Sequence, residues 1–148
     1  MVRTVRRLSI PKMRCGRDMD PNAPIMIVGS DASFCYLMRR YVTQSAYAAA
    51  SAYFGEDILA MALREPPIAI LLEADPPLNR GWELLQALKA NAVTRSIPIV
   101  LCAWPEQAEE DLCARADSYL TKPVLYGDFL EAMAQIGIVE KRSAQAAS

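Results

Sequence analysis

A short, continuous apolar run near the middle of the chain constrains the fold most. Residues 68–72 read Ile-Ala-Ile-Leu-Leu, and a run this short and this apolar is typical of a strand that is buried on both faces. The run ends on a carboxylate, Glu73, and a loop with two prolines separates it from a helical pattern that begins at Gly81. In an open parallel sheet, ligands bind beyond the carboxyl ends of the strands. We therefore predict a functional site around Glu73.

Short apolar runs alternate with helical patterns along most of the chain. The strands are predicted at residues 25–28, 47–53, 68–72, 97–103 and 118–121. Helices are predicted at 56–65, 81–91 and 105–116, with further apolar helical stripes from Phe34 to Val42 and from Phe129 to Ile136. This order predicts an α/β fold with right-handed crossovers: a flavodoxin-like, five-stranded parallel sheet of order 2-1-3-4-5, with five helices distributed over both faces.

The 148 residues suit one domain, and a hydrophobic content of 53% supports a sizeable core. We predict a flexible basic arm over residues 1–23, a domain over 24–136 and a flexible tail over 137–148. The arm carries six Lys/Arg and two Asp, a net charge of +4, but no groove-reading motif accompanies that charge, so we expect no nucleic-acid partner. No apolar stretch suits a membrane span or a secretory signal, and we expect a cytoplasmic protein.

The chain contains no histidine, which excludes histidine acid–base catalysis, Ser-His-Asp triads and a Cys/His zinc site. Its four cysteines form no C-x-x-C pair and are expected to be reduced, mostly buried thiols. They are Cys15, Cys35, Cys102 and Cys113. A thiol redox sensor at Cys102 remains an alternative, since a neighbouring Lys122 would lower the pKa of its thiol.

Two segments carry a family resemblance. The LLE…P…GWELL pattern around Glu73 and the Thr121-Lys122-Pro123 triplet resemble the receiver domains of bacterial two-component response regulators, the CheY-like family, over residues 24–136. The resemblance implies the fold above, phosphorelay signalling without enzymatic turnover of a substrate, and a histidine kinase or other signalling protein as partner. In that family an aspartate at the position of Glu73 accepts a phosphoryl group, assisted by Mg²⁺.

The residues at the phosphoacceptor site depart from the family pattern. The acidic pair that holds Mg²⁺ falls on Gly29 and Ser30, and Asp31 comes one residue late, at a helix cap. We therefore expect weak or absent Mg²⁺ binding, no metal site, no cofactor and no catalytic residue. At the acceptor position, Glu73 would extend about one C–C bond further than an aspartate.

The positions that contact the phosphoryl group and switch the domain are also altered. The family hydroxyl after the fourth strand falls on Cys102 or Ala103, whereas the phosphate-binding lysine is retained as Lys122 and the switch aromatic corresponds to Tyr119. An ion pair between Glu73 and Lys122 would imitate the phosphorylated state. If that pair is exposed to solvent, its contribution to stability is small, on the order of 0–1 kcal/mol.

We accordingly predict a stand-alone pseudo-receiver that acts through phosphorylation-independent protein contact. It is expected to dimerise or bind a partner through the face of helix four, strand five and helix five, where helix four is acidic. Its acidic residues are Glu106, Glu109, Glu110 and Asp111. The alternatives are a decayed site with Glu73 as a tolerated polar residue, a phosphorylatable regulator with unusual residues such as Asp75, and a flavodoxin-like ligand-binding protein, although GSDAS at 29–33 lacks the glycines of a phosphate loop.

Overall fold

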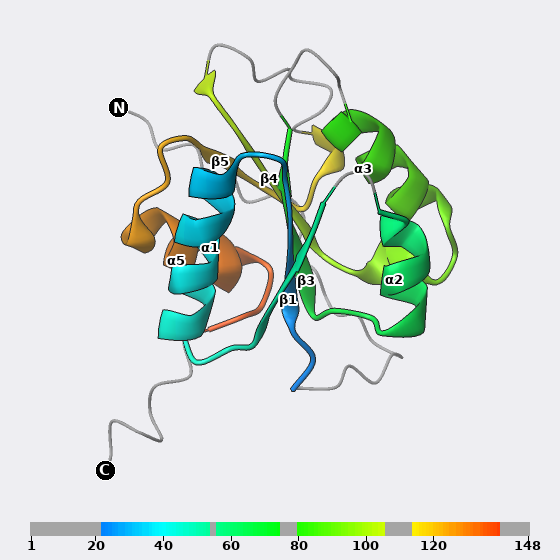
Figure 1. Ribbon diagram of the computed structural model, residues 1–148, viewed down its shortest axis with the longest axis horizontal. Coiled ribbons are helices and arrows are strands. Elements are labelled where there is room, and N and C mark those ends of the chain that lie inside the picture. Colours follow the sequence, from blue (N-terminus) through cyan, green and yellow to red (C-terminus); the bar gives the residue numbers. More distant parts are fainter. Residues whose placement is uncertain (1–21, 54–55, 75–79, 106–113, 140–148) are drawn as a thin grey trace.

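The computed structural model describes residues 22–53, 56–74, 80–105 and 114–139 of this protein. They contain a single five-stranded sheet in the order β2-β1-β3-β4-β5, and every neighbouring pair of strands is parallel (Figure 1). The predicted sheet topology is therefore confirmed. The strands are β1 (Ile25–Val28), β2 (Ala49–Ala52), β3 (Ala69–Glu73), β4 (Ile99–Ala103) and β5 (Ser118–Thr121).

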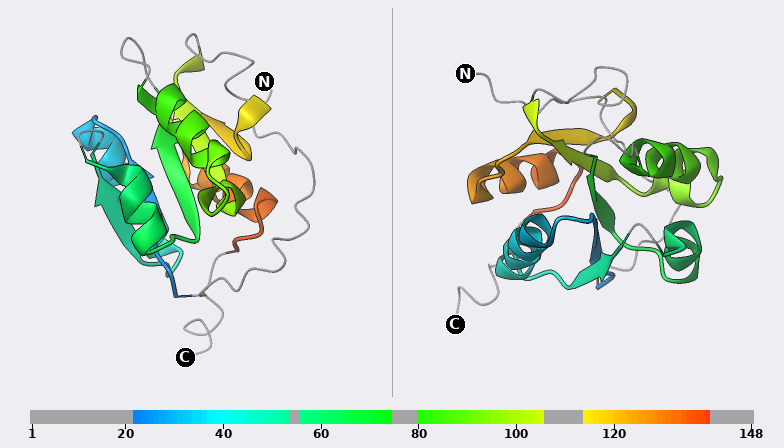
Figure 2. Two further views of the ribbon diagram at one scale, coloured as in Figure 1. Left: turned by 90° about the vertical axis from the view of Figure 1, so that its right-hand side faces the viewer. Right: turned by 45° about the horizontal axis from the view of Figure 1, so that its top comes forward.

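Helices cover both faces of the sheet, as predicted. Figures 1 and 2 show α1 and α5 against one face and α2 and α3 against the other. These helices are α1 (Ala32–Gln44), α2 (Ile58–Arg64), α3 (Arg80–Ala90) and α5 (Tyr126–Gln135). The described residues thus hold four α-helices rather than the predicted five, because most of the expected fourth helix lies in 106–113, outside them. None of the helices in these ranges is long and apolar enough to cross a membrane.

The start of β4 differs from its prediction. A strand was expected from Ile97, but a 3-10 turn, η1 (Thr94–Ser96), precedes it and the strand begins at Ile99. The Asn91 side chain accepts hydrogen bonds from the N–H groups of Val93 and Thr94, which bends the chain after α3. Pro98 has no N–H to offer a neighbouring strand. Side-chain capping therefore overrides the apolar pattern at this point.

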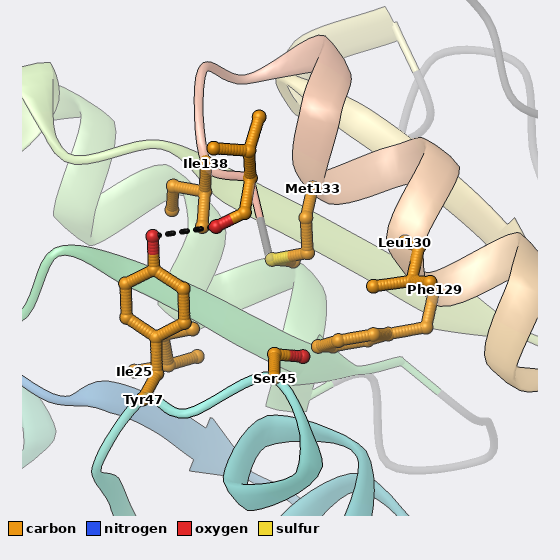
Figure 3. Close-up of a pocket in the computed structure, with 8 residues that line it drawn as sticks. Ile25, Ser45, Tyr47, Phe129, Leu130, Met133 and Ile138 are labelled. Carbon is orange, nitrogen blue, oxygen red and sulfur yellow. Dashed lines mark hydrogen bonds between the residues drawn. The ribbon is translucent and has the colours of Figure 1, made fainter. Parts of the chain in front are cut away.

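Strand β2 is also shorter than the predicted 47–53. The backbone after α1 continues in a turn, with Ala46 at a φ of +72° and the N–H of Tyr47 donating to Val42. The Tyr47 hydroxyl then donates to the carbonyl of Val139 at 2.8 Å (Figure 3). Tyr47 therefore ties the end of the described chain to the sheet instead of extending β2.

Two apolar clusters, one on each face of the sheet, form the core. Successive β1 residues alternate between them: Ile25 and Ile27 face α1 and α5, whereas Met26 and Val28 face α2 and α3. All residues of β1, β3 and β4 are buried, as expected for parallel strands covered on both sides. Burying each large aliphatic side chain stabilises the fold by about 1.5–3 kcal/mol.

The packed part of the chain extends beyond residue 136. Ile138, which was assigned to a tail, is 5% exposed and belongs to the cluster under α5. Together with Phe129 and Met133 it lines a small pocket at the amino-terminal end of β1 (Figure 3). This pocket lies at the end of the sheet opposite Glu73, so it has no part in the predicted site.

Candidate functional site

The candidate site is formed where β3, β4 and β5 end. Glu73, the last residue of β3, is in register with Cys102 of β4, and the N–H of the next residue, Ala74, donates to the Cys102 carbonyl. Lys122 directly follows β5, and its N–H donates to the carbonyl of Ala103 at 2.8 Å. The parallel register therefore brings Glu73 and Lys122 together although 49 positions separate them in the sequence.

A buried ion pair joins these two residues. Lys122 Nζ lies 2.6 Å from Glu73 Oε2, and the side chains are 5% and 3% exposed. The expectation of a small stabilising contribution depended on solvent exposure, and the burial of the pair removes that premise. Removing one partner from a buried pair leaves an uncompensated charge in a poorly solvated place.

Two aromatic rings flank the lysine. Lys122 Nζ lies 4.8 Å from the centre of the Phe34 ring, on α1, and 5.7 Å from the centre of the Trp104 ring, just after β4. A cation within about 6 Å of an aromatic face is attracted by the negative charge density above the ring. Phe34 is buried, whereas Trp104 is 41% exposed. The Trp104 side chain thus lies against the lysine of the ion pair on one side and is exposed to solvent on the other.

The second carboxylate oxygen of Glu73 is bound by the backbone after β1. The N–H groups of Ser30 and Asp31 donate to Glu73 Oε1 at 2.8 Å and 3.2 Å. Hydrogen bonds to an ionised acceptor are stronger than neutral ones. Both oxygens of this carboxylate are therefore engaged by groups of the chain itself.

The absence of a side chain at Gly29 makes this arrangement possible. A Cβ atom at position 29 would lie 2.5 Å from Glu73 Oε1 and 3.0 Å from Glu73 Cβ. Gly81, at the start of α3, serves the same residue from the other side, since a Cβ there would lie 2.8 Å from the Glu73 carbonyl oxygen. Glu73 therefore depends on a glycine against its side chain and another against its backbone.

The described residues around Glu73 do not provide the ligand set that a Mg²⁺ ion needs. Mg²⁺ requires several oxygen ligands in octahedral geometry, but Gly29 and Ser30 supply no carboxylate. Asp31 is the N-cap of α1, where its side chain accepts the N–H of Ser33 at 3.1 Å. Across the described ranges, no three Asp, Glu, Cys or His residues gather in a way that could hold a metal. Asp75, the alternative acceptor, lies outside those ranges.

The three predicted switch positions are packed in the interior. Cys102, Ala103 and Tyr119 are all buried. Cys102 belongs to the cluster beneath α1 and α5, while Ala103 and Tyr119 belong to the one beneath α2 and α3. A redox-sensing thiol must reach solvent and form a thiolate, so complete burial of Cys102 argues against that alternative.

Cys35 is a cysteine near the site that the sequence did not single out. It lies on α1 and is partly exposed. Burial, followed by the negative charges of Glu73 and Asp31, raises the pKa of its thiol, and Lys122 opposes this only in part. Less thiolate is therefore present at neutral pH than for a free cysteine, which makes Cys35 a poor nucleophile.

The sequence interpretation missed the parts of the site that are not side-chain charges. It treated Gly29 and Ser30 as lost carboxylates, whereas they supply space and a backbone donor to Glu73. It also missed Phe34, which appeared only as one residue of an apolar stripe. The available signal was the coincidence of a longer acid at 73 with the smallest residue at 29.

Comparisons with known proteins agree with this fold. The response regulator PleD of Caulobacter vibrioides is 31% identical to this chain over 106 residues, covering 70% of this chain and 23% of PleD. This chain therefore spans about a quarter of the length of that relative. Protein PilH of Pseudomonas aeruginosa is 27% identical over 105 residues, covering 69% of this chain and 87% of PilH. No protein-family model matches the chain.

Solved structures with a similar fold include a protein named as a response regulator and one named as a chemotaxis protein. The bacteriophytochrome response regulator RtBRR superposes with a TM-score of 0.67 and 27% identity, covering 78% of each chain. The chemotaxis protein CheY4 of Vibrio cholerae superposes with a TM-score of 0.65 and 20% identity, covering 77% of this chain and 98% of that one. The second likeness shows the fold alone, while the first adds sequence similarity to a response regulator.

Proposed function

We propose that this chain, which carries a receiver domain of the response-regulator family, takes part in two-component signalling without being phosphorylated. In this proposal the Glu73–Lys122 pair holds one signalling conformation permanently, and the protein acts in the cytoplasm by binding other signalling proteins rather than as an enzyme. A conformational equilibrium shifts only when an interaction differs between its two states. We propose that the buried ion pair forms only in the signalling conformation, so that it favours this state over the other.

The engagement of the Glu73 carboxylate on both sides carries the proposal. Its two oxygens accept hydrogen bonds from Ser30, Asp31 and Lys122. These bonds occupy three of the roughly four lone-pair positions of the carboxylate and make it a weaker nucleophile toward a phosphoryl donor. The lysine that the family resemblance assigns to the phosphoryl group is already bound to a carboxylate. Phosphoryl transfer also needs a metal to offset the developing charge, and the described residues offer no group of ligands for one.

Exposure to acetyl phosphate and Mg²⁺ is expected to leave the mass of the protein unchanged. The acceptor carboxylate is buried and hydrogen-bonded, and it lacks the metal ligands that would activate the donor. Intact-mass spectrometry before and after incubation measures the result. A gain of one phosphoryl group that hydroxylamine removes would contradict the proposal, because hydroxylamine cleaves acyl phosphates.

The Asp75→Asn variant is the control for that experiment. Asp75 is the other carboxylate that the sequence places next to the acceptor position. A phosphoryl gain that disappears in Asp75→Asn would assign the protein to the rival class of phosphorylatable regulators with a displaced acceptor. A gain that persists in Asp75→Asn and disappears in Glu73→Gln would show instead that Glu73 itself is an acceptor.

The proposed contact surface is the side of the sheet where β5 and α5 lie, with a histidine kinase, another signalling protein or a second copy of the chain as partner. Leu125, at the N-cap of α5, is 64% exposed there. The acidic residues predicted for helix four lie in 106–113, outside the described part of the chain. The proposal thus combines an exposed apolar residue with the acidic sequence of residues 106–113.

Self-association through this surface is expected to appear as a concentration-dependent rise in sedimentation coefficient. Leu125→Glu should reduce it, because a charge replaces an apolar contact at the same exposed position. Leu63→Glu, on α2 and 40% exposed, is the matched control at a different surface and should leave association unchanged. Sedimentation as a monomer at high concentration, with no binding partner recovered, would contradict this part of the proposal.

A further inference from the structure

The three groups that hydrogen-bond to the Glu73 carboxylate are all donors. Ser30 and Asp31 contribute backbone N–H groups at 2.8 Å and 3.2 Å, and Lys122 contributes an ammonium at 2.6 Å. A backbone N–H and a lysine ammonium can donate but cannot accept. A carboxylate oxygen can only accept, so donors and acceptors match on both sides of the group. These contacts are of the kind that hold a free anion in a binding site.

The elements that carry these donors are also held by contacts that do not involve Glu73. Ser30 and Asp31 lie between β1 and α1, whose residues are held by the sheet and by the core beneath α1. Lys122 is anchored to β4 by its backbone N–H and flanked by Phe34 and Trp104. The Asp31 carboxylate is the nearby negative group that would oppose an anion, but it is exposed and accepts the N–H of Ser33.

We propose that Ser30, Asp31 and Lys122 form a carboxylate-binding site whose ligand is the side chain of Glu73. The covalent tether keeps this ligand at a high effective concentration, so a free carboxylate cannot compete with it. Removing the tethered group leaves a site that accepts a small free carboxylate. This inference does not depend on the proposed function, because the site exists whether or not a partner protein responds to it.

The Glu73→Ala variant in sodium acetate tests the proposal. Truncation at Cβ removes a CH₂ group and a carboxylate, and acetate has the same two carbon atoms and two oxygens. Acetate is expected to raise the melting temperature of Glu73→Ala in a saturable manner, by on the order of 5 °C over sodium chloride at equal ionic strength. The wild-type protein should show no difference between the two salts.

Two further variants separate site binding from general salt effects. Glu73→Val fills the vacated space with carbon atoms while leaving the lysine unpaired, so acetate should not stabilise it. Glu73→Ala combined with Lys122→Met keeps the space but removes the charge, and the acetate effect should fall at least tenfold in apparent affinity. Equal melting temperatures of Glu73→Ala in acetate and in chloride overturn the proposal, as does an equal acetate effect in Glu73→Val.

A second measurement applies if Glu73→Ala does not fold in chloride. Refolding is then compared in the two salts, and acetate is expected to restore a cooperative thermal transition that chloride does not. The emission of Trp104, whose ring lies 5.7 Å from Lys122 Nζ, reports occupancy in a Trp82→Phe background. A chain that stays unfolded in both salts overturns the proposal, because a preformed site would recover folding free energy from its ligand.

Discussion

Glu73→Gln is expected to lower the free energy of unfolding by about 3–5 kcal/mol, the usual cost of removing one partner from a buried ion pair. The substitution keeps the shape of the side chain but replaces one hydrogen-bond acceptor with a donor. A glutamine presents one oxygen and one NH₂ group, whereas Ser30, Asp31 and Lys122 all donate. In either orientation the NH₂ group therefore meets another donor. Urea unfolding followed by circular dichroism measures the change.

Lys122→Met is the matched control on the other side of the pair. It removes the ammonium and retains a side chain of similar length, while Glu73 keeps its two backbone donors. We expect a smaller loss than for Glu73→Gln, and a double variant no less stable than the less stable single variant, because both act through one interaction. Losses below about 1 kcal/mol in both single variants would show that the pair behaves like an exposed one.

Gly29→Ala is expected to destabilise the protein by about 1–3 kcal/mol, as overpacking of a well-packed site does. The new Cβ would lie 2.5 Å from Glu73 Oε1 and 3.0 Å from Glu73 Cβ. The carboxylate could move aside only by losing its hydrogen bonds to Ser30 and Asp31. The free energy of unfolding measures the loss, and the thermal midpoint should fall with it.

Gly127→Ala provides a matched glycine control. Gly127 lies in α5, and a Cβ there would meet nothing within 4 Å, so alanine should be neutral or stabilise the helix by about 0.5–1 kcal/mol. Combining Gly29→Ala with Glu73→Ala should cost less than the sum of the two single changes, since the truncated side chain vacates the contested space. Additive losses would place the effect of Gly29→Ala in the backbone instead.

Much of the fold could be predicted because the signals were strong and local. The bounds of β1 and β5 agree with the prediction, and Asp31 caps α1 as expected. The start of β4 could not be predicted, because it depends on hydrogen bonds that the Asn91 side chain accepts from the backbone, and these compete with an apolar pattern. Local competition of this kind is invisible to periodicity alone.

The site was predictable in its charges but not in its environment. The carboxyl ends of β3 and β5 lie at the same edge of the sheet with β4 between them, which is close enough for the long lysine side chain, and the predicted ion pair is present. Its burial depends on Phe34 and Trp104, which come from two other parts of the chain. No sequence pattern links these four residues, and burial decides whether the pair contributes little or several kcal/mol to stability.

The close approach of Gly29 to Glu73 also restricts which pairs of residues positions 29 and 73 can hold together. A residue with a Cβ at position 29 leaves too little room for the present glutamate at 73, so single substitutions reach this pair most readily when glycine comes first. The same contact acts in the other direction, because an acid introduced at position 29 would clash with the Glu73 carboxylate and be repelled by its like charge. Each residue therefore limits what the other position can hold, and an acid at position 29 is compatible with the present backbone only if position 73 also changes.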